Sequence, residues 1–340
     1  PREKGSCMKK FRTAVIGCGG ISQVHLTALS KMENVELVSV ADVKEDRAKA
    51  KAEAFHCAWT TDWSEYVRDP SIEVVHLCTP HYLHAPMAIA LLDAGKRVLT
   101  EKPIASEVKD AEAMIAHADG RLGVVFQNRY NEASQIIKSA VEQGTYGKLL
   151  SLRAAVNWHR TPEYYTESGW RGRFATEGGG VLINQSIHTL DLLLYFAGRP
   201  VSVRGKVSTD VLYDYIEVED TAHGLIHFEN GLMANFYCTT TFGIDRPVEI
   251  ELVFEKGILK TDAETLYETV DGETRALCRS AASGEKAYWG TSHEILIRDF
   301  YKAAEENKPF WIDGESAIPV LRLLKAVYAS SAQDGKEIRL

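Results

Sequence analysis

The first third of the chain alternates short apolar runs with amphipathic stretches. The apolar runs are rich in β-branched residues and lie at 11–16, 35–40, 74–77, 98–99 and 122–126. Between them, the stretches at 24–29, 44–55 and 85–94 carry apolar residues at helical spacing. Strands that recur with helical spacers are typical of βαβ units, so we predict an α/β fold with a parallel, doubly wound sheet.

A different pattern begins near residue 148. Longer runs with partial alternation of apolar and polar positions follow at 149–158, 201–207, 221–228, 232–241 and 248–254. Asn230-Gly231 is a strong hairpin turn signal between two of these runs, and Lys256-Gly257 plays a similar part before 258–260. With helices expected at 182–195, 294–305 and 317–330, this half predicts an α+β domain with an open, mostly antiparallel sheet. We place the two domains at 8–127 and 128–340.

Composition and charge narrow the possible functions. Apolar residues make up 45% and charged residues 25% of the chain, as in an ordinary globular enzyme, and a formal net charge of −8 gives no support to a nucleic-acid partner. No apolar run approaches the roughly 20 residues of a membrane-spanning helix. The six scattered cysteines predict no metal site and a cytoplasmic location. The polar segment 1–7 lacks the apolar core of a secretory signal, and we expect the native chain to start at Met8.

The segment FRTAVIGCGGIS, residues 11–22, combines a strand, a glycine turn and the start of a helix. Gly17 permits a tight turn, and Gly19 lets the backbone approach a pyrophosphate without a Cβ atom in the way. A helix that begins near Gly20 and Ile21 would direct its N–H groups at the phosphates. A GxG motif also occurs in ordinary turns, and Ser22 stands where a third glycine is usual, but the flanking strand and helix favour a dinucleotide site.

An acidic residue follows the next predicted strand. Asp42 lies twenty residues after Ser22, where a carboxylate can accept hydrogen bonds from the adenosine ribose and repel a 2′-phosphate. This position predicts NAD as the cofactor. Two alternatives stay open, because Asp42 could instead cap the following helix and Lys44 could attend the 2′-phosphate of NADP.

Two further strand ends bring polar residues to the same sheet edge, where open α/β sheets bind ligands. Thr79 and Pro80 follow one strand, where Pro80 would stiffen the turn and His84 could cap or orient the same loop. Pro80 and His84 could instead be plain strand-to-helix punctuation. In the segment GKRVLTEKPIA, Lys102 follows another strand. A lone lysine usually lies on a solvated face, but an ammonium in a semi-enclosed cleft can have a lowered pKa and handle a proton.

The segment EGGGVLINQSIHTLDLLLYFAG, residues 177–198, has three glycines ahead of an expected helix. On that helix, Asn184, His188 and Asp191 would share one face, which is costly for a buried-looking helix unless the face lines a cleft. His188 suits general acid–base work, Asp191 could fix its tautomer, and Asn184 could hold a substrate hydroxyl. A core histidine in a polar network is the alternative, whereas a metal site is rejected for want of further ligands.

The loop WHRTPEYYTESGWRGRF, residues 158–174, is dense in aromatic residues and arginines. Aromatic faces stack on sugar C–H surfaces, and arginine forks pair with hydroxyls, carboxylates or phosphates. The predicted substrate residues here are Trp158, Arg160, Tyr165, Trp170 and Arg171. A loop packed against its own domain or a neighbouring subunit is the competing interpretation.

Together, the segments GCGGIS, TPHYLH, EKP and GGGVLINQSIH resemble the Gfo/Idh/MocA oxidoreductase family, which includes glucose–fructose oxidoreductase and inositol dehydrogenases. The resemblance spans nearly the whole chain and implies a Rossmann domain followed by a catalytic domain. It implies catalytic roles for Lys102 and His188. The family's aspartate position holds Asn184, which cannot carry charge or take a proton, so the general-base role falls on His188 or Lys102.

The resemblance also implies cofactor contacts and an assembly. Glu101 would lie near the nicotinamide ribose, and Gln127 and Asn128 are further cofactor candidates. In the family, the open face of the second sheet often makes subunit contacts, which implies a homodimer or homotetramer.

We therefore expect hydride transfer between NAD and a secondary hydroxyl of a sugar, cyclitol or sugar derivative, with His188 taking the hydroxyl proton and Lys102 assisting. Two rival hypotheses use the same scaffold. A glycosidase with tightly held NAD would cleave a glycoside without net change in the cofactor. A non-catalytic NAD-sensing regulator would need neither proton-transfer residue.

Overall fold

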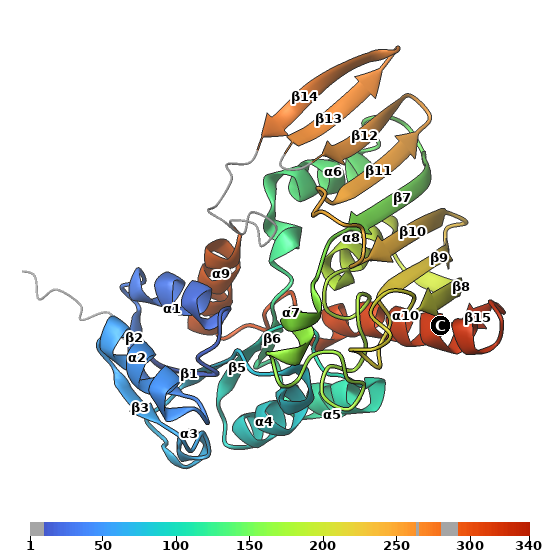
Figure 1. Ribbon diagram of the computed structural model, residues 1–340. Coiled ribbons are helices and arrows are strands. Elements are labelled where there is room, and N and C mark those ends of the chain that lie inside the picture. The colour runs from blue at the N-terminus through green and yellow to red at the C-terminus, as the bar shows by residue number, and fades with distance from the viewer. Residues whose placement is uncertain (1–9, 263–264, 280–291) are drawn as a thin grey trace, which may run out of the picture.

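Two β-sheets form the framework of the computed structural model (Figure 1). The structure describes residues 10–262, 265–279 and 292–340, and the start expected at Met8 lies outside them. In these described ranges, no helix has the length and apolar character needed to cross a membrane.

The first sheet is parallel throughout, with the strand order β3-β2-β1-β4-β5-β6. This order runs outward in both directions from the central pair, so the predicted doubly wound sheet is confirmed. Its strands are β1 (Phe11–Ile16), β2 (Val35–Ala41), β3 (Ala58–Thr60), β4 (Val74–Leu77), β5 (Arg97–Thr100) and β6 (Leu122–Val124). Its helices are α1 (Ser22–Ser30), α2 (Glu45–Phe55), α3 (Glu65–Arg68), α4 (His81–Asp93) and α5 (Val108–Ala118).

Several element boundaries in this half differ from the prediction by one to four residues, and two of them have a local cause. The helix α4 begins four residues before the predicted start at 85, since Pro86 lies inside it and obscures its first turn in the sequence. The strand β6 ends at Val124 rather than 126, because the Phe126 N–H folds back onto the Val124 carbonyl at 3.1 Å.

The second sheet has the order β14-β13-β12-β11-β7-β10-β9-β8-β15, and only β7 and β10 pair in parallel among its described strands. The predicted open, mostly antiparallel sheet is therefore confirmed. The Asn230-Gly231 turn joins the antiparallel pair β9 and β10, with Gly231 at φ +83°. The strands are β7 (Leu149–Asn157), β8 (Pro200–Ser208), β9 (Thr221–Phe228), β10 (Met233–Thr239), β11 (Glu249–Phe254), β12 (Gly257–Asp262), β13 (Thr265–Val270), β14 (Glu273–Arg279) and β15 (Ile338–Arg339).

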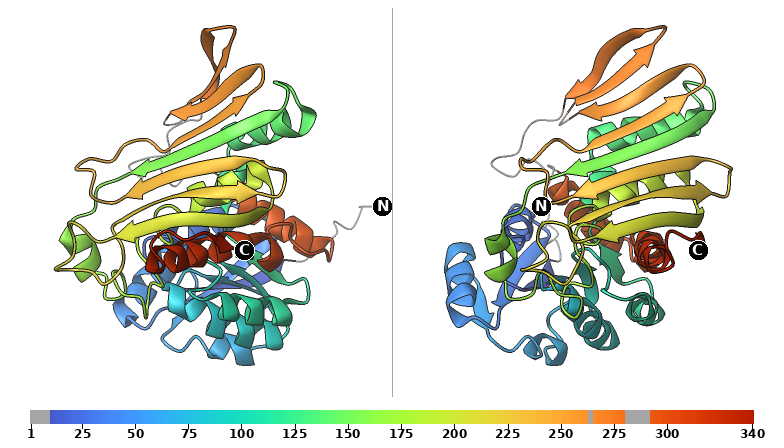
Figure 2. Two further views of the ribbon diagram at one scale, coloured as in Figure 1. Left: turned by 90° about the vertical axis from the view of Figure 1, so that its right-hand side faces the viewer. Right: turned by 45° about the vertical axis from the view of Figure 1, so that its right-hand side comes forward.

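Helices cover one face of the second sheet and leave the other open (Figure 2). The longest of them, α10, packs along β8, and α8 packs on β7. The helices of this half are η1 (a 3₁₀ turn, Gln127–Tyr130), α6 (Glu132–Gln143), α7 (Pro162–Thr166), α8 (Ile187–Ala197), α9 (His293–Glu305) and α10 (Gly314–Ala332).

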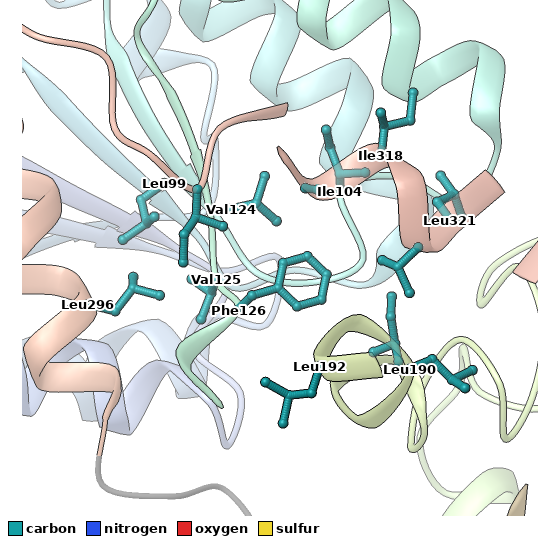
Figure 3. Packing of buried hydrophobic residues seen from close by; sticks show 14 of the residues in the cluster. Leu99, Ile104, Val124, Val125, Phe126, Leu190, Leu192, Leu296, Ile318 and Leu321 are labelled. Carbon is teal, nitrogen blue, oxygen red and sulfur yellow. The ribbon is translucent and has the colours of Figure 1, made fainter. Parts of the chain in front are cut away.

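One hydrophobic core runs through both halves of the molecule (Figure 3). Phe126, just after β6, packs toward Leu190 of α8, and Ile318 of α10 lies close to Ile104, which follows β5. All four side chains are almost completely buried. Burial of this kind is the main stabilising term in folding, and here it holds the carboxyl ends of the parallel strands against α8.

Candidate active site

A cleft of about 710 Å³ opens at the carboxyl ends of the parallel strands and is closed on its far side by the segment between β7 and α8. Both halves of the chain therefore contribute to it. The predicted site residues that line this cleft are Gly17, Gly19, Gly20, Ile21, Asp42, Thr79, Pro80, Glu101, Lys102, Gln127, Trp158, Arg160, Trp170, Arg171, Asn184 and His188. The predicted residues that do not line it are His84, Asn128 and Tyr165.

The glycine turn after β1 has the geometry that a pyrophosphate requires. Gly17 has φ +94°, and a Cβ atom there would lie 2.5 Å from the Cys78 carbonyl oxygen, so only glycine fits. At Gly19 a Cβ atom would meet nothing within 4 Å, because this position faces the open cleft. No side chain caps the N-terminus of α1. The N–H groups of Gln23 and Val24 donate to the carbonyl oxygens of Gly20 and Ile21, so the N–H groups that can meet a ligand are those of the turn before them. The residues present thus fit a dinucleotide.

Asp42, directly after β2, is fixed by the backbone on both sides. Its Oδ2 accepts a hydrogen bond from the Cys18 N–H at 2.7 Å, and its Oδ1 accepts one from the Lys44 N–H at 2.9 Å. Lys44 is the N-cap residue of α2 and no side chain caps that helix, so Asp42 does not serve as the helix cap. Each carboxylate oxygen keeps a lone pair for a ribose hydroxyl. Lys44 and Arg47 line the same end of the cleft.

His84 supports the cleft from behind. Its side chain is fully buried, and its ring nitrogens lie 2.9 Å from the Thr79 carbonyl oxygen and 2.7 Å from that of Pro103. The ring therefore ties the loop after β4 to the loop after β5 and orients both. Within the first loop, the Thr79 hydroxyl is buried without a hydrogen-bond partner, as expected of a group that awaits a ligand.

Glu101 is a buried, ionised carboxylate at the end of β5. Burial alone would raise its pKa, but the hydrogen bond to His25 and the nearby His293 outweigh burial and hold the pKa well below its usual range. The His25 Nε2 atom lies 2.9 Å from Oε1, and the His293 Nε2 atom lies 3.7 Å from the same oxygen. A fixed negative charge thus lies directly beside Lys102.

Lys102 points across the cleft toward the second half of the chain. Its Nζ donates a hydrogen bond to the Asn184 carbonyl oxygen at 2.8 Å. Burial lowers the pKa of Lys102 to about 8, with Glu101 opposing this shift and Arg171 adding to it. An amine that titrates near the working pH suits proton transfer.

Asn184 lies in the turns before α8, where the predicted helix 182–195 has not yet begun. α8 starts at Ile187, because the Glu219 carboxylate accepts hydrogen bonds from the N–H groups of Gly180 and Leu182, both at 2.9 Å, and holds the preceding chain in turns. The expected shared helical face of Asn184, His188 and Asp191 is therefore not formed. Asn184 instead donates through Nδ2 to Glu177 Oε1 at 2.5 Å.

His188 lies at the start of α8 and lines the cleft without the partner that the sequence predicted. Asp191 does not contact its ring: both Asp191 oxygens pair with Arg129, at 2.6 and 2.8 Å. The His188 Nδ1 atom is buried without a hydrogen-bond partner, and the ring packs edge-on against Phe126. Burial and the nearby Lys102 hold the pKa of His188 well below its ordinary value, so the imidazole is neutral.

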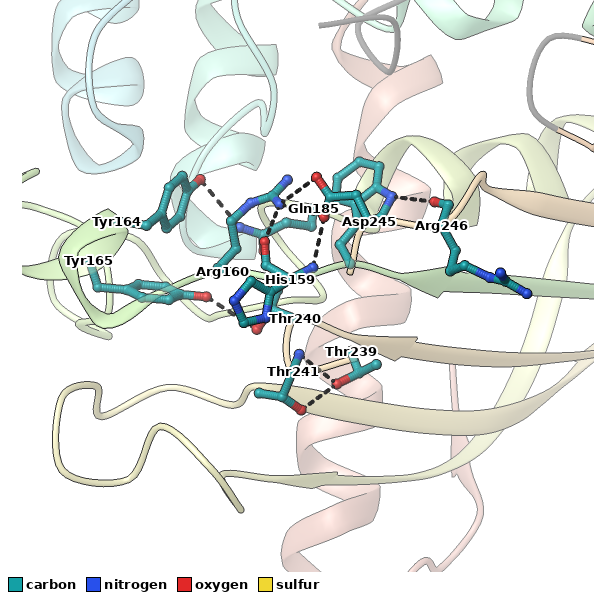
Figure 4. A network of polar contacts seen from close by, with 11 residues as sticks. His159, Arg160, Tyr164, Tyr165, Gln185, Thr239, Thr240, Thr241, Asp245 and Arg246 are labelled. Atoms are coloured by element: carbon teal, nitrogen blue, oxygen red, sulfur yellow. Dashed lines mark hydrogen bonds and ion pairs between the residues drawn. The ribbon is translucent and has the colours of Figure 1, made fainter. Parts of the chain in front are cut away.

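The aromatic loop lies at the mouth of the cleft, where several of its side chains are engaged within the protein (Figure 4). Arg160 pairs with Asp245 at 2.9 Å, and the Trp158 indole donates to the Arg246 carbonyl at 3.1 Å. Tyr165 is turned away into a small apolar cluster, where its hydroxyl contacts Thr240. The neighbouring Tyr164 lines the cleft in its place.

Several residues that line the cleft, or that hydrogen-bond to its lining as Glu177 does to Asn184, were not singled out from the sequence. Glu177 is buried, accepts a hydrogen bond from the Gly172 N–H at 2.6 Å, and has its pKa raised to about 7 by burial. His81, in the first turn of α4, donates through Nδ1 to the Glu177 carbonyl at 2.7 Å and packs edge-on against Trp170. Glu177 directly precedes the three glycines, which was the one available signal for it. Others that line the cleft are Arg47, Trp63, Tyr164, Gln185 and His293.

Among the described residues, no three His, Cys, Asp or Glu side chains gather in a way that could hold a metal ion. The cleft brings together a dinucleotide cradle, the Lys102 amine with its lowered pKa, the neutral imidazole of His188 and the buried carboxylate of Glu101.

Comparison with known proteins agrees with this geometry. Residues 11–130 match the model of the oxidoreductase family with an NAD-binding Rossmann fold, and residues 134–260 match that of the GFO/IDH/MocA C-terminal domain. An uncharacterized oxidoreductase, YrbE, of Bacillus subtilis is 27% identical over 71% of each chain. The myo-inositol 2-dehydrogenase of Thermotoga maritima is 25% identical over 97% of this chain and 98% of its own.

Solved structures extend the likeness to the whole chain. The WlbA dehydrogenase of Bordetella pertussis, in complex with NADH and UDP-GlcNAcA, superposes with a TM-score of 0.84 at 28% identity, covering 98% of this chain and 99% of that one. A levoglucosan dehydrogenase has the same fold, with a TM-score of 0.87 at 22% identity, over 98% of this chain and 99% of its own. The glycine cradle, the EKP lysine and both family models converge, and the chain belongs to the Gfo/Idh/MocA family of NAD-binding oxidoreductases.

Proposed function

We propose that the chain oxidises a secondary hydroxyl of a sugar, cyclitol or sugar derivative with NAD as the hydride acceptor. The observation that carries this proposal is Lys102, whose amine stands in the same cleft as the glycine cradle with a pKa of about 8. The relatives support the substrate class, because they include a myo-inositol 2-dehydrogenase and a dehydrogenase bound to NADH and a nucleotide sugar.

The cofactor would be held by residues of the first sheet. Gly17, Gly19 and the N-terminus of α1 would bind the pyrophosphate, and Asp42 would accept hydrogen bonds from the adenosine ribose. The carboxylate there favours NAD over NADP. When bound, NAD supplies the acceptor for the hydride that leaves the substrate carbon.

We assign the hydroxyl proton to Lys102 rather than to His188, reversing the roles expected from the sequence. His188 has no carboxylate partner, since Asp191 is bound to Arg129, and a second positive charge beside Lys102 would be unfavourable. Neutral Lys102 can take the proton, and Glu101 beside it stabilises the resulting ammonium. The neutral imidazole of His188 is left to hydrogen-bond the substrate oxygen.

Asn184 and Glu177 would position these groups. The Asn184 carbonyl holds the Lys102 amine at 2.8 Å, and the Asn184 amide group is anchored on Glu177. This anchoring uses the amide N–H and leaves Oδ1 to accept a hydrogen bond from a substrate hydroxyl.

The test is a panel of hexoses, inositols, sugar phosphates and nucleotide sugars, each mixed with the protein and NAD or NADP while the absorbance of reduced cofactor is followed. We expect reduction with one substrate class and a preference for NAD. Silence across the panel, with NAD binding measured separately, would contradict the proposed dehydrogenase and favour the glycosidase or the sensor.

We also propose that the chain works in the cytoplasm as a homo-oligomer. The five described cysteines are free thiols, as in a reducing compartment. On the open face of the second sheet, Met233 and Tyr237 of β10 are 48% and 43% exposed, which suits a contact between copies. Light scattering coupled to gel filtration tests the oligomeric state, and a monomer at micromolar concentration would contradict the proposed homo-oligomer.

A further inference from the structure

Arg171 occupies an unusual position in the substrate half of the cleft. Its guanidinium lies 4.4 Å from the centre of the Tyr164 ring and 4.7 Å from that of Trp170. Two aromatic faces thus fix the orientation of the fork, which is how arginine is held when its N–H groups are to be presented to a ligand.

No carboxylate of the described chain lies within ion-pair distance of this guanidinium, and its Nε atom is buried without a hydrogen-bond partner. Two other arginines near the site differ in this respect. Arg160 is paired with Asp245 and Arg129 with Asp191. Arg171 as a whole is half-buried, but its buried Nε donor without a partner costs free energy that a bound anion would recover.

The charged groups around Arg171 are Lys102, which adds a second cation, and the acids Glu101 and Glu177. Lys102 faces the same space, and Arg171 is close enough to lower its pKa. The nearby acid, Glu177, has both oxygens engaged, one by the Gly172 N–H and the other by Asn184. Arg171 acts on this acid through space and lowers its pKa, but among the described residues the two form no direct ion pair.

We propose that the sugar substrate carries an anionic group, a carboxylate or a phosphate, and that Arg171 binds it as the specificity-determining residue of the cleft. This inference rests on the proposed function of the site, which supplies the sugar. The planar fork of an arginine matches either anion with two parallel hydrogen bonds, and a neutral hydroxymethyl group cannot replace them.

The experiment measures binding apart from turnover. Titration calorimetry on the protein–NADH complex would compare D-glucuronate with D-glucose, UDP-glucuronate with UDP-glucose, and glucose 6-phosphate with glucose. The variants are Arg171→Gln and, as the matched control, Arg173→Gln, because Arg173 is exposed on the same loop. We expect the protein and the control to prefer an anionic sugar by roughly tenfold or more, and Arg171→Gln to lose most of that preference.

The three pairs of ligands distinguish a carboxylate from a phosphate as the anionic group. Preference for a uronate assigns the carboxylate, and preference for the 6-phosphate assigns the phosphate. Neutral sugars that bind as tightly as anionic ones, no measurable binding of any anionic sugar, or a preference that survives in Arg171→Gln would each overturn the inference. NAD reduction with a neutral sugar would leave the dehydrogenase standing while the anion site fails. A preference for anionic sugars without NAD reduction would support the anion site and contradict the proposed dehydrogenase.

Discussion

At the scale of single residues, the chemistry depends on which group takes the hydroxyl proton. Replacing Lys102 by methionine keeps most of the length of the side chain and removes the amine. We expect kcat to fall roughly a hundredfold or more, while NAD affinity and the melting temperature change little. His188→Gln should lower kcat less, since it removes a hydrogen bond rather than the proton acceptor. Steady-state kinetics of both variants check this, and unchanged turnover in Lys102→Met would refute the assignment.

The same assignment fixes the sign of the pH dependence. Burial lowers the pKa of Lys102 to about 8, so the neutral amine becomes more abundant as the pH rises from 7 to 9. Glu101 stays ionised throughout, because its pKa lies well below its usual range. Sugar oxidation should therefore have a kcat/KM that rises with pH and levels off above about 9. A profile that falls through pH 8 would instead identify the ammonium as the active form.

Arg171 offers an internal control for that profile. Its charge is one of the causes that lower the pKa of Lys102, so Arg171→Gln should move the rising limb to higher pH. Arg173→Gln, on the exposed part of the loop, should leave the limb in place. If the pH at which kcat/KM rises is the same in both variants and the parent, Arg171 does not influence the group that accepts the proton.

At the scale of elements, two of the three glycines in the turn between β1 and α1 have different structural roles. Gly17→Ala would place a Cβ 2.5 Å from the Cys78 carbonyl oxygen at φ +94°, so we expect a lower melting temperature and loss of NAD binding together. Gly19→Ala meets nothing within 4 Å and should leave the melting temperature unchanged while NAD affinity falls. Thermal unfolding and NAD titration of both variants check this. Equal effects of the two substitutions on stability would contradict it.

The elements also show where sequence reasoning succeeds and where it stops. Continuous apolar runs predicted the parallel sheet, because its inner strands are buried on both faces. The Asn230-Gly231 turn predicted the β9–β10 hairpin, and helical spacing of apolar residues predicted the last two helices. None of these patterns predicted β14, whose side chains are mostly exposed. The start of α8 depends on Glu219, which is distant in the sequence. Whether Tyr164 or Tyr165 lines the cleft depends on the rotation of the short helix α7 about its axis. The sequence does not show this rotation, because the two tyrosines are adjacent and alike.

At the scale of the whole molecule, buried polar groups tie the last helices to the first sheet. His25, which is bonded to Glu101, also contacts His76, with 2.8 Å between their Nδ1 atoms. The His76 Nε2 atom lies 3.1 Å from the Tyr301 hydroxyl of α9, and that hydroxyl lies 2.8 Å from the Thr13 hydroxyl of β1. All five side chains are almost completely buried. The chain thus connects the site to the packing of α9 and keeps Glu101 in one orientation.

A second buried polar cluster joins η1 to α8 and α10, and it allows a structural role of Asp191 to be distinguished from a catalytic one. Arg129 pairs with Asp191 through two hydrogen bonds and donates to the Ser316 carbonyl at 3.0 Å. The exposed fractions of the two charged side chains are 7% and 2%. Asp191→Ala would leave the guanidinium buried and unpaired, so we expect the free energy of unfolding to fall by roughly 3–5 kcal/mol. Denaturant unfolding measures this loss.

The double variant Arg129→Met/Asp191→Leu should regain most of that stability, because apolar replacement of both partners removes the uncompensated charge. Catalysis distinguishes the two roles of Asp191. If it only supports packing, kcat of the folded Asp191→Ala protein should stay within a few-fold of the parent value. If it fixed the tautomer of His188, as the spacing in the sequence suggested, kcat should collapse in Asp191→Ala and stay low in the double variant. The Arg129 pairing favours the first result, in which stability and activity change independently.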